Sequence, residues 1–439
     1  MSDAAAAEPP AIKRRHVAAA VAGNALEFYD FTTYSFFSAS IGQAFFPSGP
    51  GGLSTTEYGS LMLSLGTFGA GFLLRPLGGL IIGHYADRAG RRPAMLISFS
   101  LMGLAILALA FIPSYSAIGL AAPLLAIAAR LTQGFALGGE VGPTTAYLVE
   151  SAPARLRGLY ASWQSASQSL AAMTGGTVGF VLALSLSSGD LKVWGWRIAF
   201  VLGAMTLPFG LYIRSSLPET LHTRDHLPEY ELEGTGLLRI VRDHARPILL
   251  GLMILTGGTV ATYVLNYMTT FAQTNLKMAA SPSFAATLVN GLVGLVASLA
   301  GGWLSDVVGR RWMMIVPRAL FLLAAYPVFV LIVDQRSTTA LLAGTAILSV
   351  LLNISTGAFY VGFTELLPKR VRGVIFATVY ASAISVFGGT TQIFVAWLMH
   401  ATGNNMAMSW YMLFGTGLSL IAMFLMRETA PVRLEAKTA

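Results

Sequence analysis

The stretch Gly83-His84-Tyr85-Ala86-Asp87-Arg88-Ala89-Gly90-Arg91-Arg92 follows one hydrophobic segment, and a related stretch, Gly302-Trp303-Leu304-Ser305-Asp306-Val307-Val308-Gly309-Arg310-Arg311, follows another. Their aspartates are 219 residues apart, half of the 439-residue chain. A second pair of stretches, 150–158 and 365–373, repeats at an offset of 215 residues. Two matches in the same order, separated by apolar chain, indicate a duplicated membrane bundle.

The composition indicates that lipid surrounds most of the chain. Hydrophobic residues make up 55% of the sequence and charged residues 11%, with a mean hydropathy of +0.66, and this is about half the charge of a typical soluble domain. Because a membrane-spanning helix needs roughly 20 apolar residues, the stretches between charged turns predict twelve helical spans. The predicted spans are residues 17–46, 58–86, 93–112, 117–148, 159–187 and 194–216 in the first half, and 246–273, 283–305, 312–334, 338–366, 373–399 and 406–427 in the second.

The basic residues predict which side of the membrane each loop faces. An even number of spans places both terminal tails, 1–16 and 428–439, on one side, and Lys and Arg near span ends mark the cytoplasmic side. The basic residues on the side of the termini are Lys13, Arg14, Arg15, Arg88, Arg91, Arg92, Arg155, Arg157, Arg310, Arg311, Lys369, Arg370, Arg372 and Arg427. The opposite loops carry Lys192, Arg197, Lys277 and Arg336. Both tails are therefore predicted to be cytoplasmic, and the net charge of +8 reflects this topology and the anionic inner leaflet rather than nucleic-acid binding.

Residues 217–245, in which Pro, Glu, His and Arg are frequent, form the predicted cytoplasmic linker between a six-span bundle at 17–216 and another at 246–427. His222 and His226 in this linker are four residues apart, a spacing that could hold a metal on a helix. A solvated linker helix is the favoured interpretation, and no metal site is predicted. The chain also lacks cysteine, which excludes thiolate nucleophiles and disulfides, and it has no P-loop that would bind ATP.

The basic start of the chain, with the apolar run up to Ala22, is similar to a signal peptide. The apolar run is too short, however, because Asn24 and Glu27 follow it at once. Removal of this segment would also leave an odd number of spans. The segment is therefore predicted to belong to the first span.

The two repeated stretches resemble the major facilitator superfamily over nearly the whole chain, where they match the loops between the second and third helices and between the eighth and ninth. Residues 23–31 (GNALEFYDF), 75–79 (RPLGG) and 130–135 (RLTQGF) look like the bacterial metabolite:proton symporter family, which carries organic acids and zwitterions. Residues 163–168 (WQSASQ) with 194–198 (WGWRI) are similar to its citrate and tricarballylate members.

This resemblance implies an all-α membrane protein with the twelve-helix major facilitator fold, two six-helix bundles with inverted repeats, in a bacterial inner membrane. It places the first, fourth, seventh and tenth spans around a central cavity. It also implies a monomer that works by alternating access and needs no cofactor beyond a proton gradient, for which a sodium gradient is the alternative.

Charged residues inside the bilayer are functional candidates, because each costs several kcal/mol unless it is paired or faces water. Asn24, Glu27 and Asp30 are three residues apart and share one stripe of the first span. Asp30 lies roughly 20 Å from the start of that span at 1.5 Å per residue, and Arg130 lies at a similar depth in the fourth. The second half repeats neither charge, since Leu249 stands at the position equivalent to Asp30.

A proton switch follows from these charges. When Asp30 or Glu27 takes a proton, Arg130 loses its counter-charge and becomes free to bind a substrate carboxylate. Substrate and proton then favour each other's binding by linkage. The alternative is a buried ion pair that only orients the helices. Glu140 either relays the proton or pairs with a basic loop residue, and pairing is favoured.

Further polar residues are predicted to line the cavity. Arg75 binds an anion, extends toward the lipid headgroups or bonds to a helix end, and the neutral candidates of the second half have the alternative role of interhelical contacts. The predicted substrate-binding residues are Arg130, Arg75, Asn24, Gln133, Gln164, Gln168, Tyr263, Asn266 and Tyr360, with Tyr267, Asn353, Ser355, Thr356, Tyr380 and Gln392 as further candidates.

The repeated loops are predicted to form a gating latch rather than a transport site. Asp87 near the positive end of another helix is stabilised by the helix dipole. Basic residues of the same loop could pair with Glu150. In the second copy, Val307 stands at the position that Arg88 has in the first copy, so the second latch is expected to be weaker. The predicted latch residues are Asp87, Arg88, Arg91, Arg92, Glu150 and Asp306.

Taken together, these patterns predict a secondary active transporter that imports a di- or tricarboxylate, with citrate as the best candidate, by proton symport. A proton symporter of a zwitterionic osmolyte or other small organic acid is the alternative. Drug efflux is less favoured because arginines would face an apolar cation. A membrane enzyme is also less favoured, because no nucleophile and base constellation emerges from the sequence.

Overall fold

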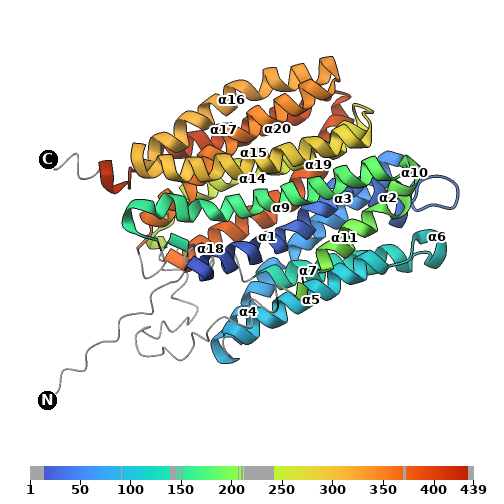
Figure 1. Ribbon diagram of the computed structural model, residues 1–439, viewed down its shortest axis with the longest axis horizontal. Helices are drawn as coiled ribbons and strands as arrows, with labels where there is room; N and C mark the ends of the chain where they lie inside the picture. Colours follow the sequence, from blue (N-terminus) through green and yellow to red (C-terminus); the bar gives the residue numbers. More distant parts are fainter. Residues whose placement is uncertain are drawn as a thin grey trace.

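The computed structural model of the protein describes residues 14–89, 91–138, 145, 148–149, 152–205, 207–208, 211, 242–368 and 372–433. These residues are helical apart from short turns, and an isolated bridge joins Ser48 to Ser54. The helices run side by side in one elongated bundle, with the first half of the chain on one flank and the second half on the other (Figure 1).

The first half begins with two helices where one span was predicted at 17–46, because the chain breaks at Phe37. Its second span is likewise divided at Leu74, two residues before Pro76 in the first turn of the following helix. The helices of this half are α1 (Arg14–Phe36), α2 (Ser38–Phe45), α3 (Glu57–Leu73), α4 (Arg75–Ala89), α5 (Arg91–Phe111), α6 (Tyr115–Ile118), α7 (Ala121–Leu137), η1 (Ala154–Leu156), α9 (Arg157–Ser185), α10 (Ser188–Asp190), η2 (Leu191–Gly195) and α11 (Trp196–Met205).

The second half contains longer unbroken helices, except that its fifth span includes a π-helical turn. The helices of this half are α14 (Ala245–Thr274), α15 (Ala280–Val308), α16 (Arg310–Gln335), α17 (Thr338–Leu366), α18 (Arg372–Ala383), η3 (Ile384–Gly388), α19 (Gly389–Thr402) and α20 (Ala407–Leu425). The predicted linker at 217–245, with His222 and His226, lies outside the described residues except for its last four positions.

Nine helical segments among the described residues are long and apolar enough to cross a membrane. Each of the twelve predicted spans contains at least one helix. The three that fall short of the criterion are α1, which carries Glu27 and Asp30, α7, which has 17 residues, and α11, of which ten are described. Large apolar side chains such as Leu73, Leu323 and Phe414 are exposed on the flanks, as expected for a surface that contacts lipid.

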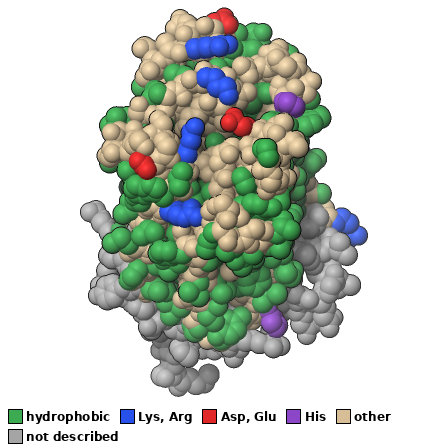
Figure 2. All heavy atoms as spheres, turned by 90° about the vertical axis from the view of Figure 1, so that its right-hand side faces the viewer, with side chains coloured by type: hydrophobic (Ala, Val, Ile, Leu, Met, Phe, Trp, Pro, Cys, Tyr) green, Lys and Arg blue, Asp and Glu red, His purple; other side chains and the backbone are tan. Residues whose placement is uncertain are grey.

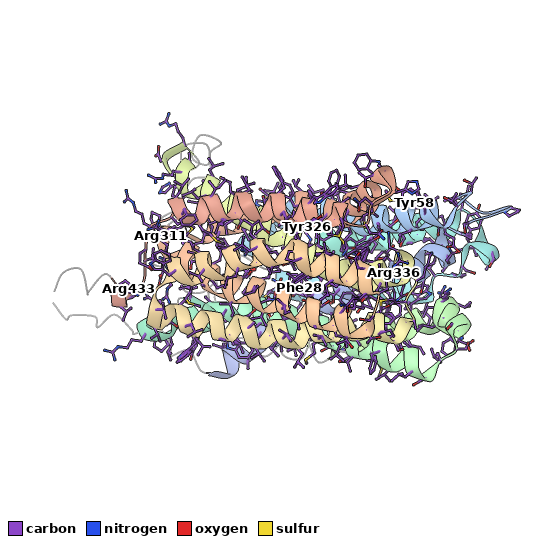
Figure 3. The ribbon with its side chains drawn as sticks, turned by 90° about the horizontal axis from the view of Figure 1, so that it is seen from above. Phe28, Tyr58, Arg311, Tyr326, Arg336 and Arg433 are labelled. Carbon is purple, nitrogen blue, oxygen red and sulfur yellow. The ribbon has the colours of Figure 1, made fainter. Side chains whose placement is uncertain are left out.

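The described chain begins and ends at the same end of the bundle (Figure 1), as an even number of spans requires. We call it the terminal end; Arg311 and Arg433 lie there, whereas Tyr58 and Arg336 lie at the opposite end (Figure 3). Figure 2 looks onto the opposite end and shows basic and acidic side chains that are scattered among apolar ones. That the terminal end faces the cytoplasm stays a prediction from the basic residues.

Glycines bring the two halves close together where α9 packs on α15. A side-chain carbon added at Gly158 would lie 2.3 Å from the carbonyl oxygen of Gly302, and one added at Gly291 would lie 2.1 Å from the nitrogen of Met173. Small residues permit this approach, which membrane helices use to gain packing. Gly158 and Gly302 belong to the two repeated stretches, so the repeats mark a contact between the halves.

Candidate functional site

A central cavity of about 90 Å³ lies between the halves. Phe28 on its wall lies near the middle of the bundle's length (Figure 3). The cavity is smaller than the roughly 300 Å³ of typical small-molecule sites, so a tricarboxylate requires the halves to move apart. The polar residues on its wall are Thr32, Ser35, Ser165, Gln168, Ser169, Thr259, Thr262, Tyr263, Asn266, Asn290, Arg318, Asn353, Thr356, Tyr360 and Tyr380.

The predicted pair of Asp30 and Arg130 is present and buried. Arg130 Nη1 lies 3.5 Å from Asp30 Oδ2, and the two side chains are 0% and 2% exposed. The same Nη1 donates to Gln133 Oε1, one turn further along α7. Arg130 Nε and Nη2 have no hydrogen-bond partner among the described residues. The guanidinium therefore keeps donors that an added acceptor could use.

A layer of aromatic rings separates this pair from the cavity. The Arg130 guanidinium lies 4.3 Å from the centre of the Phe31 ring and 5.3 Å from that of Phe68, and both phenylalanines line the cavity. Arg130 itself does not line it. The predicted direct contact between Arg130 and a substrate thus requires Phe31 or Phe68 to move.

Arg75 is buried beside the same aromatic layer and does not reach the headgroups, since it is 6% exposed. Its guanidinium lies 4.2 Å from the Phe72 ring and 4.5 Å from the Phe31 ring. Glu27, which lies on the same helix as Phe31, is 2% exposed. The first half therefore buries two acids and two arginines, and both guanidinium groups lie against the Phe31 ring.

Glycines let the helices that carry these arginines approach closely, and we call the contacts at Gly71, Gly134 and Gly138 a glycine seam. A side-chain carbon added at Gly134 of α7 would lie 1.8 Å from the carbonyl oxygen of Gly71 on α3, and one at Gly138 would lie 2.1 Å from the carbonyl oxygen of Arg75. A side-chain carbon added at Gly71 would lie 3.4 Å from Arg130 Nη2. The stretches RPLGG and RLTQGF thus combine a buried arginine with the glycines that let its helix approach the next.

Two of the predicted substrate-binding residues bond to each other away from the cavity wall. Asn24 donates to Ser167 Oγ at 2.6 Å, and Gln164 donates to Asn24 Oδ1 at 3.4 Å. These bonds join α1 to α9. In this state Asn24 and Gln164 therefore join two helices, a role that the sequence analysis did not give them.

The predicted residues Gln168, Tyr263, Asn266 and Tyr360 do line the cavity. Gln168 donates to the Tyr380 hydroxyl at 3.2 Å, which links the halves across the cavity. Of the further candidates, Asn353, Thr356 and Tyr380 also line it, whereas Tyr267, Ser355 and Gln392 are buried in the surrounding packing. Gln392 donates to Ser35 Oγ and so joins α19 to α1.

The sequence analysis missed Arg318 on α16, which lines the cavity and is 1% exposed. It was assigned to the ninth span, which the resemblance does not place at the cavity. Its charge at that position was the available signal, because Arg318 lies eight residues into a membrane-spanning helix.

The second repeated loop shows the predicted latch geometry at Asp306. Asp306 Oδ1 and Oδ2 accept hydrogen bonds from the backbone nitrogens of Gly158 and Leu159, at 2.8 and 3.0 Å, in the first turn of α9. Arg310 Nη1 lies 2.6 Å from Asp306 Oδ1, and its Nε lies 3.3 Å from Glu365. A carboxylate of one half thus holds the positive end of a helix from the other half.

In the first copy of the latch, Glu150 and the side chains of Asp87, Arg88, Arg91 and Arg92 lie outside the described residues, as does Glu140. The first residue of the predicted C-terminal tail contributes to the second copy. Glu428 accepts from the backbone nitrogens of Arg310 and Arg311 at 2.8 and 3.1 Å, so the predicted tail at 428–439 begins with packed residues.

Residues 21–382 match the Major Facilitator Superfamily. The chain is similar to the citrate-proton symporter of Klebsiella pneumoniae, with 34% identity over 417 residues that cover 94% of this chain and 91% of the relative. It is also 29% identical to the proline/betaine transporter of Escherichia coli (strain K12) over 444 residues, which cover 97% of this chain and 85% of the relative.

Among solved structures, the crystal structure of a D-xylose-proton symporter superimposes with a TM-score of 0.73 and 18% identity. The superposition covers 95% of this chain and 98% of that one. At this identity the likeness concerns the fold alone.

Proposed function

The chain belongs to the major facilitator superfamily, and we propose that it imports a di- or tricarboxylate by proton symport, with citrate as the best candidate. Membership confirms the predicted twelve-helix fold of two six-helix bundles with inverted repeats. It also confirms that the protein is a multi-pass membrane transporter and not an enzyme. The bacterial inner membrane, the cytoplasmic termini, the monomeric state and the proton as coupling ion belong to the proposal.

The proposal rests on an excess of buried positive charge. Away from the ends of the bundle, the buried charged side chains among the described residues are Arg75, Arg130, Arg318, Glu27 and Asp30. These are three cations and two acids, so even with both acids ionised the site has a net positive charge. An anionic substrate would neutralise this charge in a region where unpaired ions are costly.

Protonation would couple to the substrate through the first half. When Asp30 or Glu27 gains a proton, Arg130 and Arg75 lose their counter-charges, and the site becomes more attractive to a carboxylate. Binding of the carboxylate in turn favours the protonated acid by linkage. Movement of Phe31 would then expose Arg130 to the substrate, and the two halves would rock around the occupied cavity.

A zwitterionic osmolyte is the second candidate. Aromatic rings can bind a quaternary ammonium group through cation–π interactions, and Phe28, Tyr263, Tyr360 and Tyr380 line the cavity. The 29% identity to a proline/betaine transporter supports this alternative. The three buried arginines favour the carboxylate.

Uptake of labelled compounds into proteoliposomes tests the proposal. Labelled citrate, betaine and lactose are offered with and without an inward proton gradient, and a sodium gradient serves as a further arm. We expect the proton gradient to drive accumulation of citrate alone. Accumulation of betaine without citrate would establish the osmolyte alternative instead.

A further inference from the structure

We propose that Arg318 forms a second anion subsite, on the wall contributed by the second half, which binds one carboxylate of a substrate that carries at least two. This inference rests on the proposed function and deepens it, because it divides the substrate's carboxylates between the two halves.

The guanidinium of Arg318 lies deep in the bundle. Arg318 is eight residues beyond Arg310, the first residue of α16, and therefore roughly 12 Å into the helix at 1.5 Å per residue. At 1% exposure it does not extend to the lipid headgroups or to water outside the bundle. It lines the central cavity.

Two hydroxyl groups hold this guanidinium, but neither neutralises it. Arg318 Nε donates to Ser355 Oγ at 3.2 Å, and Nη2 donates to Thr356 Oγ1 at 3.5 Å. Ser355 is itself fixed, since it donates to the carbonyl oxygen of Met314 at 2.9 Å. Arg318 Nη1 has no hydrogen-bond partner and pairs with no acid among the described residues.

The contrast with Arg130 shows why a ligand is needed. Arg130 has Asp30 at 3.5 Å and rests against three aromatic rings, whereas Arg318 has hydroxyl oxygens only. Burial of an unpaired cation is costly in a bilayer. An anion in the cavity would supply the missing charge and accept from the free Nη1.

The helix opposite leaves space for such an anion. A side-chain carbon added at Gly258 of α14 would meet only Arg318 Nη2 within 4 Å, at 3.8 Å. Gly258, Asn353 and Thr356 line the cavity around this space. The amide nitrogen of Asn353 already donates to the carbonyl and hydroxyl oxygens of Ser349, at 2.9 and 3.2 Å, so Arg318 Nη1 is the donor that remains for a ligand. A carboxylate can accept from it, while a quaternary ammonium group would be repelled by Arg318.

Arg318 is therefore expected to decide how many carboxylates the substrate must have. A dicarboxylate or tricarboxylate can contact the arginines of the first half and Arg318 together. A monocarboxylate of similar length can contact only one of them. Loss of Arg318 should weaken the first class and leave the second unchanged.

The test compares citrate, succinate and butyrate as competitors of proton-driven uptake into proteoliposomes and as stabilisers in thermal unfolding, which the seven native tryptophans report. In Arg318→Gln, the apparent affinity for citrate and succinate should fall roughly tenfold to a hundredfold, as for the loss of a charged hydrogen bond, with butyrate unchanged. Gly258→Val keeps the arginine but fills the space before it, and should have the same selective effect. Arg336→Gln, an exposed arginine at the end of the same helix, serves as the matched control.

The outcomes separate this inference from the proposed function. If the wild type concentrates none of the three carboxylates, the proposed function fails, and the subsite is then judged by stabilisation alone. Stabilisation by citrate that Arg336→Gln keeps and Arg318→Gln loses would support the subsite even then. An equal loss for all three compounds in both cavity variants, or no loss in either, would show that Arg318 only fastens α16 to α17.

Discussion

The two walls of the cavity use charge in different ways. In the first half, Asp30 and Arg130 form a buried pair behind the Phe31 ring and out of contact with the cavity. In the second half, Arg318 and the neutral Tyr360 face the cavity directly. One aromatic layer therefore separates the groups that we propose to exchange a proton from the groups that we propose to contact the substrate first. Coupling should therefore depend on the first half, and initial recognition on the second.

Replacement of Arg130 by alanine is expected to have the largest effect and to abolish accumulation of substrate. It leaves Asp30 buried without its partner and removes one of the two buried cations of the first half from the substrate, at a cost of several kcal/mol. Lysine should rescue poorly, because it lacks the planar fork of the guanidinium. Proton-driven uptake, corrected for the amount of reconstituted protein, measures both variants. Near-normal uptake by Arg130→Ala would mean that this arginine is not part of the anion site.

Neutralisation of the buried acids should remove coupling while it preserves exchange. We expect Asp30→Asn, or Glu27→Gln, to transport down a gradient with a rate that no longer depends on pH, because the amide imitates the protonated acid. Counterflow of labelled substrate at several pH values provides the measurement. If both variants still concentrate substrate, the proton site lies elsewhere, and Glu140 is the next residue to test.

Removal of the Tyr360 hydroxyl from the cavity wall of the second half should change only the apparent affinity for the substrate. Tyr360→Phe takes away a hydrogen-bond donor at the cavity, and the apparent affinity should fall roughly fivefold to tenfold, as for a single lost hydrogen bond. The pH dependence of uptake should match that of the wild type, in contrast to Asp30→Asn. A shift in the pH profile of Tyr360→Phe would contradict the division of roles between the two walls.

The latches at the terminal end should give the smallest change. Asp87→Asn is expected to shift the population toward the state open at that end by about 1 kcal/mol, or several-fold, and Asp306→Asn to shift it less, because Val307 replaces the arginine found after Asp87. Both variants should still bind substrate. Since the chain has no native cysteine, single cysteines at the two mouths can report the populations by labelling. Equal labelling of wild type and Asp87→Asn would remove the latch interpretation, and a larger shift for Asp306→Asn would give the network around Arg310 the leading role.

Local composition and internal repetition are sufficient to predict the membrane-spanning helices and the duplicated architecture. Segment length and hydropathy reveal a membrane helix because every backbone polar group in lipid must be satisfied within the helix. The repeats of 83–92 and 150–158 revealed the duplication, and the isolated charges of Asp30 and Arg130 revealed the pair that the structure brings to 3.5 Å. Membership of the superfamily then confirmed the fold.

Which polar residues face the cavity depends on packing between helices that are distant in the sequence. Asn24 and Gln164 bond to each other, whereas Gln168 and Tyr360 line the cavity wall. In the sequence, all four are polar residues within predicted membrane spans. The Phe31 ring of α1 lies against the Arg130 guanidinium of α7. Arg318 of α16 lies opposite Gly258 of α14, and both line the cavity. The physical reason is that the rotation of each helix is set by packing against its neighbours at glycine seams such as Gly71 and Gly134. The spacing of residues within one helix does not specify that rotation.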